Sequence, residues 1–337
     1  MTYSVSLLDK SPVADGTTAA DALQATLRLA RRAEALGYRR FWVAEHHGAP
    51  GLASSAPEVL IAHLLAVTSH IRIGSGGVML QHYSPFKVAE TFRLLAALAP
   101  GRVDLGVGKA PGGLPATTRA LQARYVGAAR PSFDALLAEL DAFVAPPDAA
   151  TVTDDAAPPA ARALPEPPEP PQRVLLGGSP ASAALAARHG WQFCYAGHFN
   201  GDVSNIERSL AAYRDATGRA PLLALYAFAA DSAEAARREA GALRLFRLQL
   251  PNGQAVNLGS PEAASDYAAQ VGATDYRIEE LRPHAIAGSG DEIRAELDAL
   301  HRRFGVEEFV IDTPVADYAK RLASIEAIAG AVLTEPA

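Results

Sequence analysis

The feature of this 337-residue sequence that most constrains its fold is the regular alternation of short β-prone segments with amphipathic helical segments. Runs of apolar and β-branched residues mark the β-prone segments, and apolar residues three and four apart mark the helical ones. Strands that alternate with helices at this spacing are typical of a parallel sheet. Eight strands are predicted, at residues 3–8, 39–43, 71–75, 103–107, 174–176, 192–195, 222–228 and 308–311.

The predicted helices fill the gaps between these strands. The first begins after a capping pair, Thr18 and Asp21, and ends at Gly37. The others are predicted at residues 56–68, 85–98, 133–144, 180–189, 203–217, 232–249 and 291–304, with a last helix through residue 329.

A closed (β/α)8 barrel, or TIM barrel, has eight parallel strands, and its active sites lie at the carboxyl ends of these strands. The alternative α/β architecture is a doubly wound open sheet. Its dinucleotide-binding form needs glycines in the first βα turn, and residues 8–12 contain none. We therefore predict the (β/α)8 TIM barrel.

Two segments depart from the alternation. Residues 145–172 hold nine of the 24 prolines, which remove backbone donors and exclude an ordinary helix or central strand. Because the alternation continues on both sides, we interpret this segment as a mobile surface loop of one domain spanning residues 1–337, rather than as a linker between two domains.

Residues 250–283 lack clear periodicity. We predict them to be an insertion between the seventh strand and its helix, a kind of connection that often forms a lid.

Composition and charge exclude several classes of protein. Hydrophobic residues make up 49% of the chain, which suits a large core rather than a disordered polypeptide. The 31 basic and 37 acidic residues give a net charge of −6 without a basic cluster, so no nucleic-acid footprint is expected. No apolar run approaches the ~18 residues of a membrane span. With Cys194 as the single cysteine, and no leader pattern at the start, we expect a cytoplasmic protein.

The carboxyl end of the second strand carries Glu45, His46 and His47. Two imidazoles at a barrel mouth favour catalysis, because imidazole titrates near neutral pH and can act as a base or a hydrogen-bond donor. A metal site formed by these residues with His82 is a weaker alternative.

The third strand ends in Ser75, Gly76 and Gly77. A flat ring could lie against the backbone there, because glycines have no side chains. A plain turn or bulge is the commoner use of paired glycines.

The fifth strand leads into Gly177, Gly178, Ser179, Pro180 and Ser182, which we interpret as an anion site at a helix N-terminus. A serine that only caps the helix is the simpler reading. Lys109, at the end of the neighbouring fourth strand, would complete a phosphate pocket there, unless it is an ordinary solvated lysine.

With these residues in view, the chain resembles the luciferase-like flavin-dependent monooxygenase family, and most closely its single-chain oxidoreductases. The resemblance rests on ordered motifs from the first strand to the last helix: Leu-Asp-Lys-Ser-Pro-Val at 8–13, Trp-Val-Ala-Glu-His-His at 42–47, Ile-Gly-Ser-Gly-Gly-Val at 73–78, the glycine-rich stretch 101–112 and Gly-Gly-Ser at 177–179. It implies a TIM barrel that binds FMN at the carboxyl ends of its strands.

The resemblance also implies roles for single residues. His46 matches the family's active-site histidine, and Ser75, Gly76 and Gly77 match the segment against the isoalloxazine ring, often with a non-prolyl cis peptide. Gly178, Ser179 and Ser182 match the phosphate-binding turn. Lys109 stands where the family commonly has arginine, which keeps the charge but loses the bidentate geometry. Gly108 replaces the luciferase cysteine, which argues against light emission.

The expected function is oxidation of a small organic substrate by molecular oxygen and reduced FMN, which a separate flavin reductase would supply. The alternatives are an oxygen-independent FMN or deazaflavin oxidoreductase that transfers hydride, and a non-catalytic flavin-binding protein. No metal is expected. The resemblance further implies a homodimer formed through helices 56–68 and 85–98, although core packing would also explain their alanines and leucines.

Overall fold

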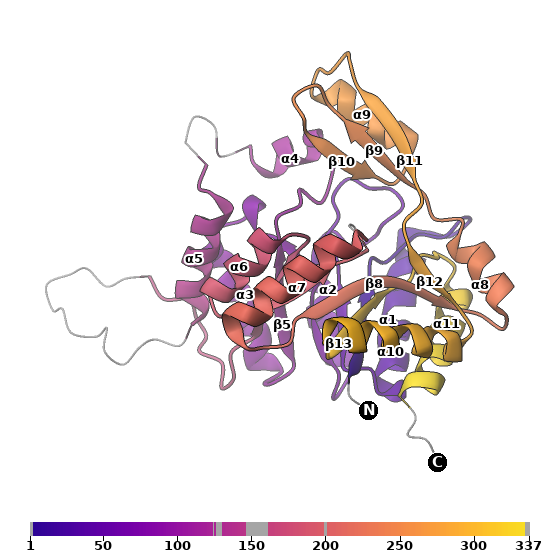
Figure 1. The fold of residues 1–337 in the computed structure, drawn as a ribbon. Helices are drawn as coiled ribbons and strands as arrows, with labels where there is room; N and C mark the ends of the chain where they lie inside the picture. Colours follow the sequence, from indigo (N-terminus) through magenta and orange to yellow (C-terminus); the bar gives the residue numbers. More distant parts are fainter. Residues whose placement is uncertain (1–2, 124, 126–129, 146–160, 199–200, 334–337) are drawn as a thin grey trace, which may run out of the picture.

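The computed structural model describes residues 3–123, 125, 130–145, 161–198 and 201–333 (Figure 1). Its centre is a closed barrel of eight parallel strands, in which β13 pairs with both β1 and β8, and β8 pairs with β7. The predicted barrel is therefore confirmed over the open sheet. The strands are β1 (Ser4–Asp9), β2 (Arg40–Val43), β3 (Arg72–Ser75), β5 (Val103–Gly108), β6 (Gln172–Gly177), β7 (Gln192–Ala196), β8 (Leu222–Ala229) and β13 (Glu308–Asp312).

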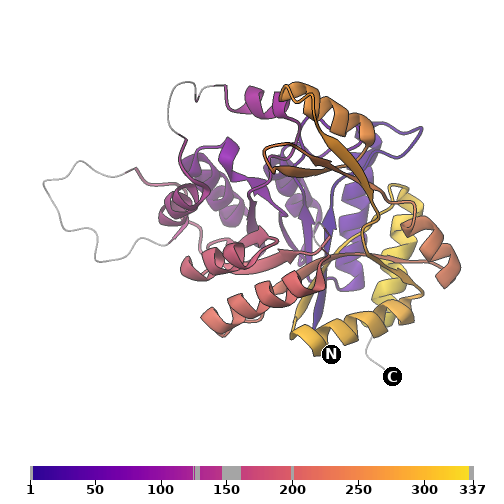
Figure 2. The ribbon, with the colours of Figure 1, turned by 45° about the horizontal axis from the view of Figure 1, so that its top comes forward.

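Helices surround this barrel and cover its outer face (Figures 1 and 2). They are α1 (Ala19–Leu36), α2 (Pro57–Val67), α3 (Pro85–Leu98), α5 (Phe133–Val144), α6 (Pro180–Arg188), α7 (Val203–Thr217), α8 (Ala233–Ala240), α10 (Gly290–Phe304) and α11 (Tyr318–Val332). The helix α1 begins at the predicted capping box of Thr18 and Asp21 and ends at Gly37, whose φ of 86° favours glycine. Two short strands extend the sheet, β4 (Val78–Met79) beside β5 and β12 (Ala285–Gly288) beside β8.

The prediction of one helix over residues 232–249 is wrong. The helix α8 ends at Ala240, and β9 (Leu245–Gln249) follows it. In β9 the completely buried Leu248 lies among less buried neighbours. Tertiary pairing there overrides the local helical pattern, because β9 is the central strand of an antiparallel sheet with the order β10-β9-β11.

The predicted insertion is a small folded unit rather than an irregular segment. It lies after the seventh barrel strand, as expected, but it begins with β9 beyond α8, before residue 250. Its other elements are β10 (Ala255–Leu258), α9 (Pro261–Gln270) and β11 (Arg277–Leu281), which pack around a core of their own. The unit lies at one end of the barrel beside α4 (Pro115–Leu121), where the Ala116 N–H donates to Gln270 Oε1 at 2.7 Å (Figures 1 and 2).

Of the proline-rich segment, residues 161–171 contain neither helix nor strand. Residues 146–160 lie outside the described residues, so the mobility of the loop stays a prediction. Among the described residues, no helix has the length and apolar character needed to cross a membrane.

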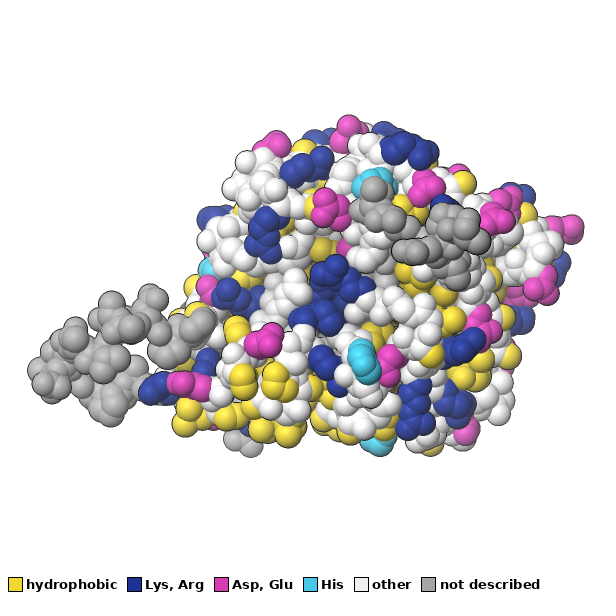
Figure 3. All heavy atoms as spheres, turned by 90° about the horizontal axis from the view of Figure 1, so that it is seen from below, with side chains coloured by type: hydrophobic (Ala, Val, Ile, Leu, Met, Phe, Trp, Pro, Cys, Tyr) yellow, Lys and Arg dark blue, Asp and Glu magenta, His cyan; other side chains and the backbone are white. Residues whose placement is uncertain are grey.

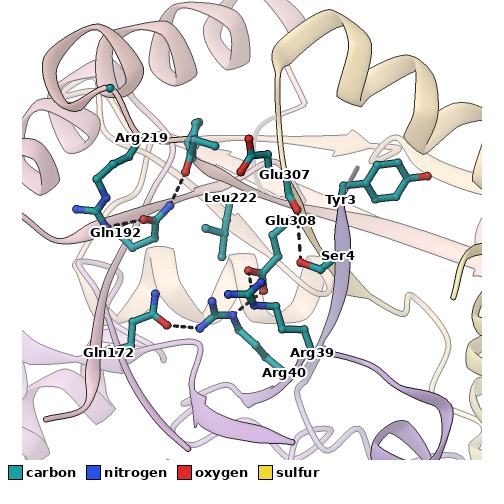
Figure 4. Close-up of a pocket in the computed structure, with 13 residues that line it drawn as sticks. Tyr3, Ser4, Arg39, Arg40, Gln172, Gln192, Arg219, Leu222, Glu307 and Glu308 are labelled. Atoms are coloured by element: carbon teal, nitrogen blue, oxygen red, sulfur yellow. Dashed lines mark hydrogen bonds and ion pairs between the residues drawn. The ribbon is translucent and has the colours of Figure 1, made fainter. Parts of the chain in front are cut away.

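The barrel interior is layered. At the amino ends of the strands Arg40 donates to Asp104 at 2.9 Å, to Glu308 at 2.6 Å and to Gln172 at 2.8 Å. Outside this layer lies a polar pocket of about 690 Å³, with Arg39 and Arg40 among its lining (Figure 4). Lys and Arg side chains gather near the centre of the molecule seen from this side (Figure 3). The end of a barrel opposite the active site serves stability rather than catalysis.

Candidate active site

A layer of polar side chains closes the barrel interior at the carboxyl ends of the strands. Below it lies an apolar cluster built from barrel strands alone, with Leu8, Trp42, Cys194, Ala224 and Val310 among its buried members. Side chains alternate between the two faces of a strand, so residues at even spacings from these also face inward. The alternation places Tyr226 of β8 and Asp312 of β13 inward; Lys10 follows β1 directly and contacts both of them, and His46 and His198 follow β2 and β7.

Lys10 connects the ends of three strands. Its Nζ lies 2.8 Å from Asp312 Oδ2 and donates to the Tyr226 hydroxyl at 3.4 Å. Burial opposes the charged ammonium, but Asp312 and Tyr226 outweigh it, and the pKa of Lys10 is raised. Lys10 is therefore positively charged at neutral pH. The imidazole of His198 packs against Tyr226, with 5.7 Å between the ring centroids.

His46 lies in the same layer. Burial, reinforced by the charges of Lys10 and His47, lowers the pKa of His46 to about 4, so its imidazole is neutral at pH 7. Its buried Nδ1 has no hydrogen-bond partner among the described residues. A buried polar atom without a partner costs free energy, which a bound ligand can remove by supplying one. Of the two roles considered from the sequence, this environment favours hydrogen bonding over proton uptake.

His47 points into a different network. Its Nε2 lies 2.8 Å from Glu45 Oε1, and the Tyr83 hydroxyl donates to the same oxygen at 2.9 Å. His82 has both ring nitrogens engaged, one by the Pro111 carbonyl at 2.8 Å and the other by the Gln122 side chain at 2.9 Å. The side chains of Glu45, His47 and His82 therefore all have hydrogen-bond partners within the protein. No cluster of metal-ligating side chains occurs in the part of the chain that the structure describes.

The opposite half of the barrel mouth is lined by glycine. By the same alternation, the inward positions at the ends of β3, β5 and β6 are Gly76, Gly108 and Gly178. A Cβ on Gly76 would lie 2.6 Å from Leu8 Cδ1 and 3.2 Å from Trp42 Cβ, so a side chain there would have to displace the packing of the barrel interior. A Cβ on Gly108 would meet only Met79, at 3.6 Å. The Gly76–Gly77 peptide bond is cis, and the Ser75 hydroxyl donates to the Gly106 carbonyl at 2.8 Å.

The predicted anion site lies next to this glycine-lined half. Ser179 caps α6 and accepts from the Ser182 N–H at 3.2 Å, and the two hydroxyl oxygens are 3.1 Å apart. Both hydroxyls therefore meet at the helix N-terminus, where the dipole favours an anion. Lys109 directly follows Gly108 and is exposed. Within the described ranges, no contact joins its ammonium to either serine.

The structure thus places His46 after β2 and the two serines after β6, at the start of α6. Sequence reasoning missed the roles of Lys10, Tyr226 and Asp312. The sequence signal that points to them is the alternation of inward and outward side chains along each strand. Using it requires knowing the exact residues at which each strand ends. At the end of β1, the buried Asp9 explains why Lys10 points inward. Asp9 accepts from the Ser11 N–H at 3.0 Å and from the Thr26 hydroxyl at 2.6 Å on the outer face of the strand, so the next side chain, Lys10, lies on the inner face.

These residues fit a bound flavin. A flat ring would lie over the glycine-lined half of the mouth, His46 Nδ1 would gain a partner, and the Ser179 and Ser182 hydroxyls would face a phosphate. The fit rests on a buried unpaired nitrogen and on strand ends without side chains.

Comparisons with known proteins agree with this geometry. Residues 1–308 match the family described as luciferase-like monooxygenase. The chain is 43% identical, over 98% of each chain, to the N-acetyl-S-alkylcysteine monooxygenase of Bacillus subtilis (strain 168). Among solved structures, apo-MsnO8 is similar with a TM-score of 0.78 and 32% identity, covering 99% of this chain and 100% of the other.

Two solved structures below 25% identity share the fold. The oxygenating constituent of 3,6-diketocamphane monooxygenase from Pseudomonas putida, in complex with FMN, has a TM-score of 0.69 and 19% identity over 98% of each chain. An F420-dependent secondary alcohol dehydrogenase has a TM-score of 0.66 and 18% identity, covering 98% of this chain and 99% of the other. Both are flavin or deazaflavin enzymes. Family match, identity and barrel geometry agree, and this chain belongs to the luciferase-like monooxygenases, a family of enzymes.

Proposed function

We propose that the chain is an FMN-dependent monooxygenase that oxidises a small organic substrate with reduced FMN and molecular oxygen. The observation that carries the proposal is the buried His46 Nδ1, which has no hydrogen-bond partner in the part of the chain that the structure describes, beside the glycine-lined half of the mouth. Reduced FMN would supply two electrons: one atom of O2 enters the substrate, the other leaves as water, and FMN returns oxidised.

The residues of this chain then have distinct tasks. His46 holds a hydrogen bond at the reacting centre as a neutral imidazole. Ser75, Gly76 and Gly77 lie along the ring, while Gly178, Ser179 and Ser182 bind the phosphate, with Lys109 supplying charge nearby. The unit of β9, β10, α9 and β11 is proposed to act as the lid that keeps water from the site.

The identity of 43% to an N-acetyl-S-alkylcysteine monooxygenase supports a small thioether as the first substrate to test. A separate reductase is proposed to supply reduced FMN. We also propose a homodimer through α2 and α3, because Val59, Leu94 and Leu98 on these helices are exposed large apolar side chains.

The test is aerobic turnover with photoreduced FMN and N-acetyl-S-methylcysteine, in which oxygen uptake and the oxidised thioether product are measured together. We expect His46→Ala to lower turnover by about 100-fold or more, the range for loss of a catalytic hydrogen-bonding or acid–base group. His70→Ala is the matched control, since His70 is an exposed histidine before the amino end of β3, whereas the proposed site lies at the carboxyl ends of the strands. A His46→Ala protein with wild-type turnover would contradict the assigned role.

The other outcomes separate the alternative functions. Turnover under anaerobic conditions with oxidised FMN or a deazaflavin would favour the hydride-transfer oxidoreductase, a chemistry named for one protein of the same fold. Tight flavin binding without turnover in either atmosphere would favour the flavin-binding protein. A chain without affinity for FMN or the deazaflavin would contradict all three.

A further inference from the structure

We propose that Lys10 and Tyr226 form the substrate-recognition site of this enzyme, and that they bind a carboxylate of an acidic substrate. The inference rests on the proposed monooxygenase function and names the class of substrate. Neither residue has a role in the cofactor site described above.

The first step of the argument is the position of Lys10. It lies inward at the end of β1, on the polar half of the mouth, and its positive charge acts on both His46 and His198. Its Nζ lies 2.8 Å from Asp312 Oδ2 and 3.4 Å from the Tyr226 hydroxyl, and the Tyr226 ring packs against His198, so the ammonium lies within the polar layer. A substrate group held there would be next to the ring proposed for the glycine-lined half.

The second step is the accessibility of the charge. The side chain of Lys10 is 22% exposed, whereas that of its partner Asp312 is only 2% exposed. Of the two charged side chains, Lys10 is therefore the one that solvent reaches. Asp312 keeps the ammonium charged and fixes its position from below.

The third step is the count of donors. An ammonium has three N–H donors. The Tyr226 oxygen accepts one of them, and Asp312 Oδ2 lies 2.8 Å away as an ion-pair partner, so at least one N–H has no acceptor among the described residues. Tyr226 accepts from Lys10, and burial raises its pKa, so its own proton stays available for donation.

The chemistry of these two donors selects the ligand. Lys10 Nζ and the Tyr226 hydroxyl lie 3.4 Å apart, a spacing that suits the two oxygens of one carboxylate. The described acidic side chain at this layer, Asp312, is already paired, so an incoming anion does not face an unpaired negative charge. A methyl ester keeps an acceptor oxygen but carries no negative charge, so it would lose the charge-assisted part of the hydrogen bond from Lys10, which weakens binding.

The experiment compares N-acetyl-S-methylcysteine with its methyl ester. Binding to the protein loaded with oxidised FMN is measured by calorimetry, and turnover is measured with reduced FMN and oxygen. We expect the wild type to bind the acid about 100-fold more tightly than the ester, as for a charge-assisted hydrogen-bonded pair. Since the binding measurement needs no turnover, its result stands even if the proposed monooxygenase function fails.

The variants test each residue separately. Tyr226→Phe keeps the Lys10–Asp312 pair and should lower the preference for the acid about tenfold. Lys10→Met alone would leave Asp312 buried and unpaired, so the double variant Lys10→Met/Asp312→Asn removes both charges and should abolish the preference. Lys87→Met, which changes an exposed lysine on α3, should keep it.

Two results would overturn the inference. One is a wild type that binds the acid no better than the ester, or that fails to bind it. The other is a double variant that keeps the preference for the acid but loses affinity for FMN, because Lys10 would then belong to the cofactor site.

Discussion

At the residue scale, one charge organises the polar half of the barrel mouth. Lys10 remains protonated because Asp312 and Tyr226 outweigh its burial, and its charge helps to keep His46 and His198 neutral. A protonated lysine beside two neutral imidazoles offers hydrogen-bond donors without placing several positive charges together. This arrangement suits the recognition of a single anionic group.

The low pKa of His46 predicts a dependence of stability on pH. The folded protein holds this pKa at about 4, below the ordinary value of 6.5. Between these values the unfolded chain binds the proton and the folded one does not, so stability is lost as pH falls from 6.5 towards 4. We expect urea unfolding at pH 5 to show about 2 kcal/mol less stability than at pH 7 from this residue.

His46→Gln isolates this contribution from those of the carboxylates and of His198. The variant should lose about 2 kcal/mol less than the wild type between pH 7 and pH 5, whereas His70→Gln should behave as the wild type. Equal losses in His46→Gln and the wild type would show that the folded protein does not hold His46 neutral.

The two lysines show what the sequence could predict at this scale. The sequence indicates Lys109 because it follows a strand beside the serine turn, and its side chain is exposed there. Lys10 stood in a recognised motif, but its role depends on Asp312 and Tyr226, which lie more than 200 positions along the chain. Only the closure of the barrel brings these residues together.

At the element scale, the strands and most helices were predictable because each has a local signature. Thr18 and Gly37 mark both ends of α1, and residues 85–98, 133–144 and 203–217 are helical within the predicted bounds. The strand β9 was not predictable in the same way. Its partners β10 and β11 come later in the chain, and antiparallel pairing with them decides its conformation.

The separate core of this insertion predicts a local response to mutation. Leu248 is completely buried there among Leu250, Tyr267 and the alanines of α9. Leu248→Ala should cost about 3 kcal/mol within the unit, because it removes buried methyl groups and leaves a cavity. Hydrogen exchange should then accelerate for residues 245–281, while amides of the barrel strands keep their protection.

The exposed Val271 at the end of α9 provides the matched control, since Val271→Ala removes methyl groups that are already in contact with water. If Leu248→Ala accelerated exchange equally in the barrel strands, the insertion would unfold together with the barrel and would not be an independent unit.

At the scale of the whole molecule, the barrel joins the parts of the chain on either side of the proline-rich segment. The strands β1, β2, β3 and β5 come before it, and β6, β7, β8 and β13 come after it. The two groups meet at two seams, β5 with β6 and β1 with β13. We therefore expect the chain to unfold as one domain, a property that alternation on both sides of the prolines suggested from the sequence.

The polar layer at the amino ends of the strands links both seams and provides the last prediction. Arg40 from β2 binds Asp104 from β5 and Glu308 from β13. The guanidinium and both carboxylates are almost completely buried. Replacing Arg40 by methionine should destabilise the protein by about 3 kcal/mol, because it removes the buried cation between two buried carboxylates and leaves Asp104 with the more exposed Arg72 and Glu308 with the exposed Arg39. The neighbouring Arg39 reaches Glu308 at 3.4 Å but is 53% exposed, so Arg39→Met should cost less than about 1 kcal/mol. Urea unfolding of both variants measures the difference.

Equal stability of the two variants would mean that burial of the Arg40 network does not hold the barrel closed. Two separate unfolding transitions in either variant would show that the two groups of strands unfold independently.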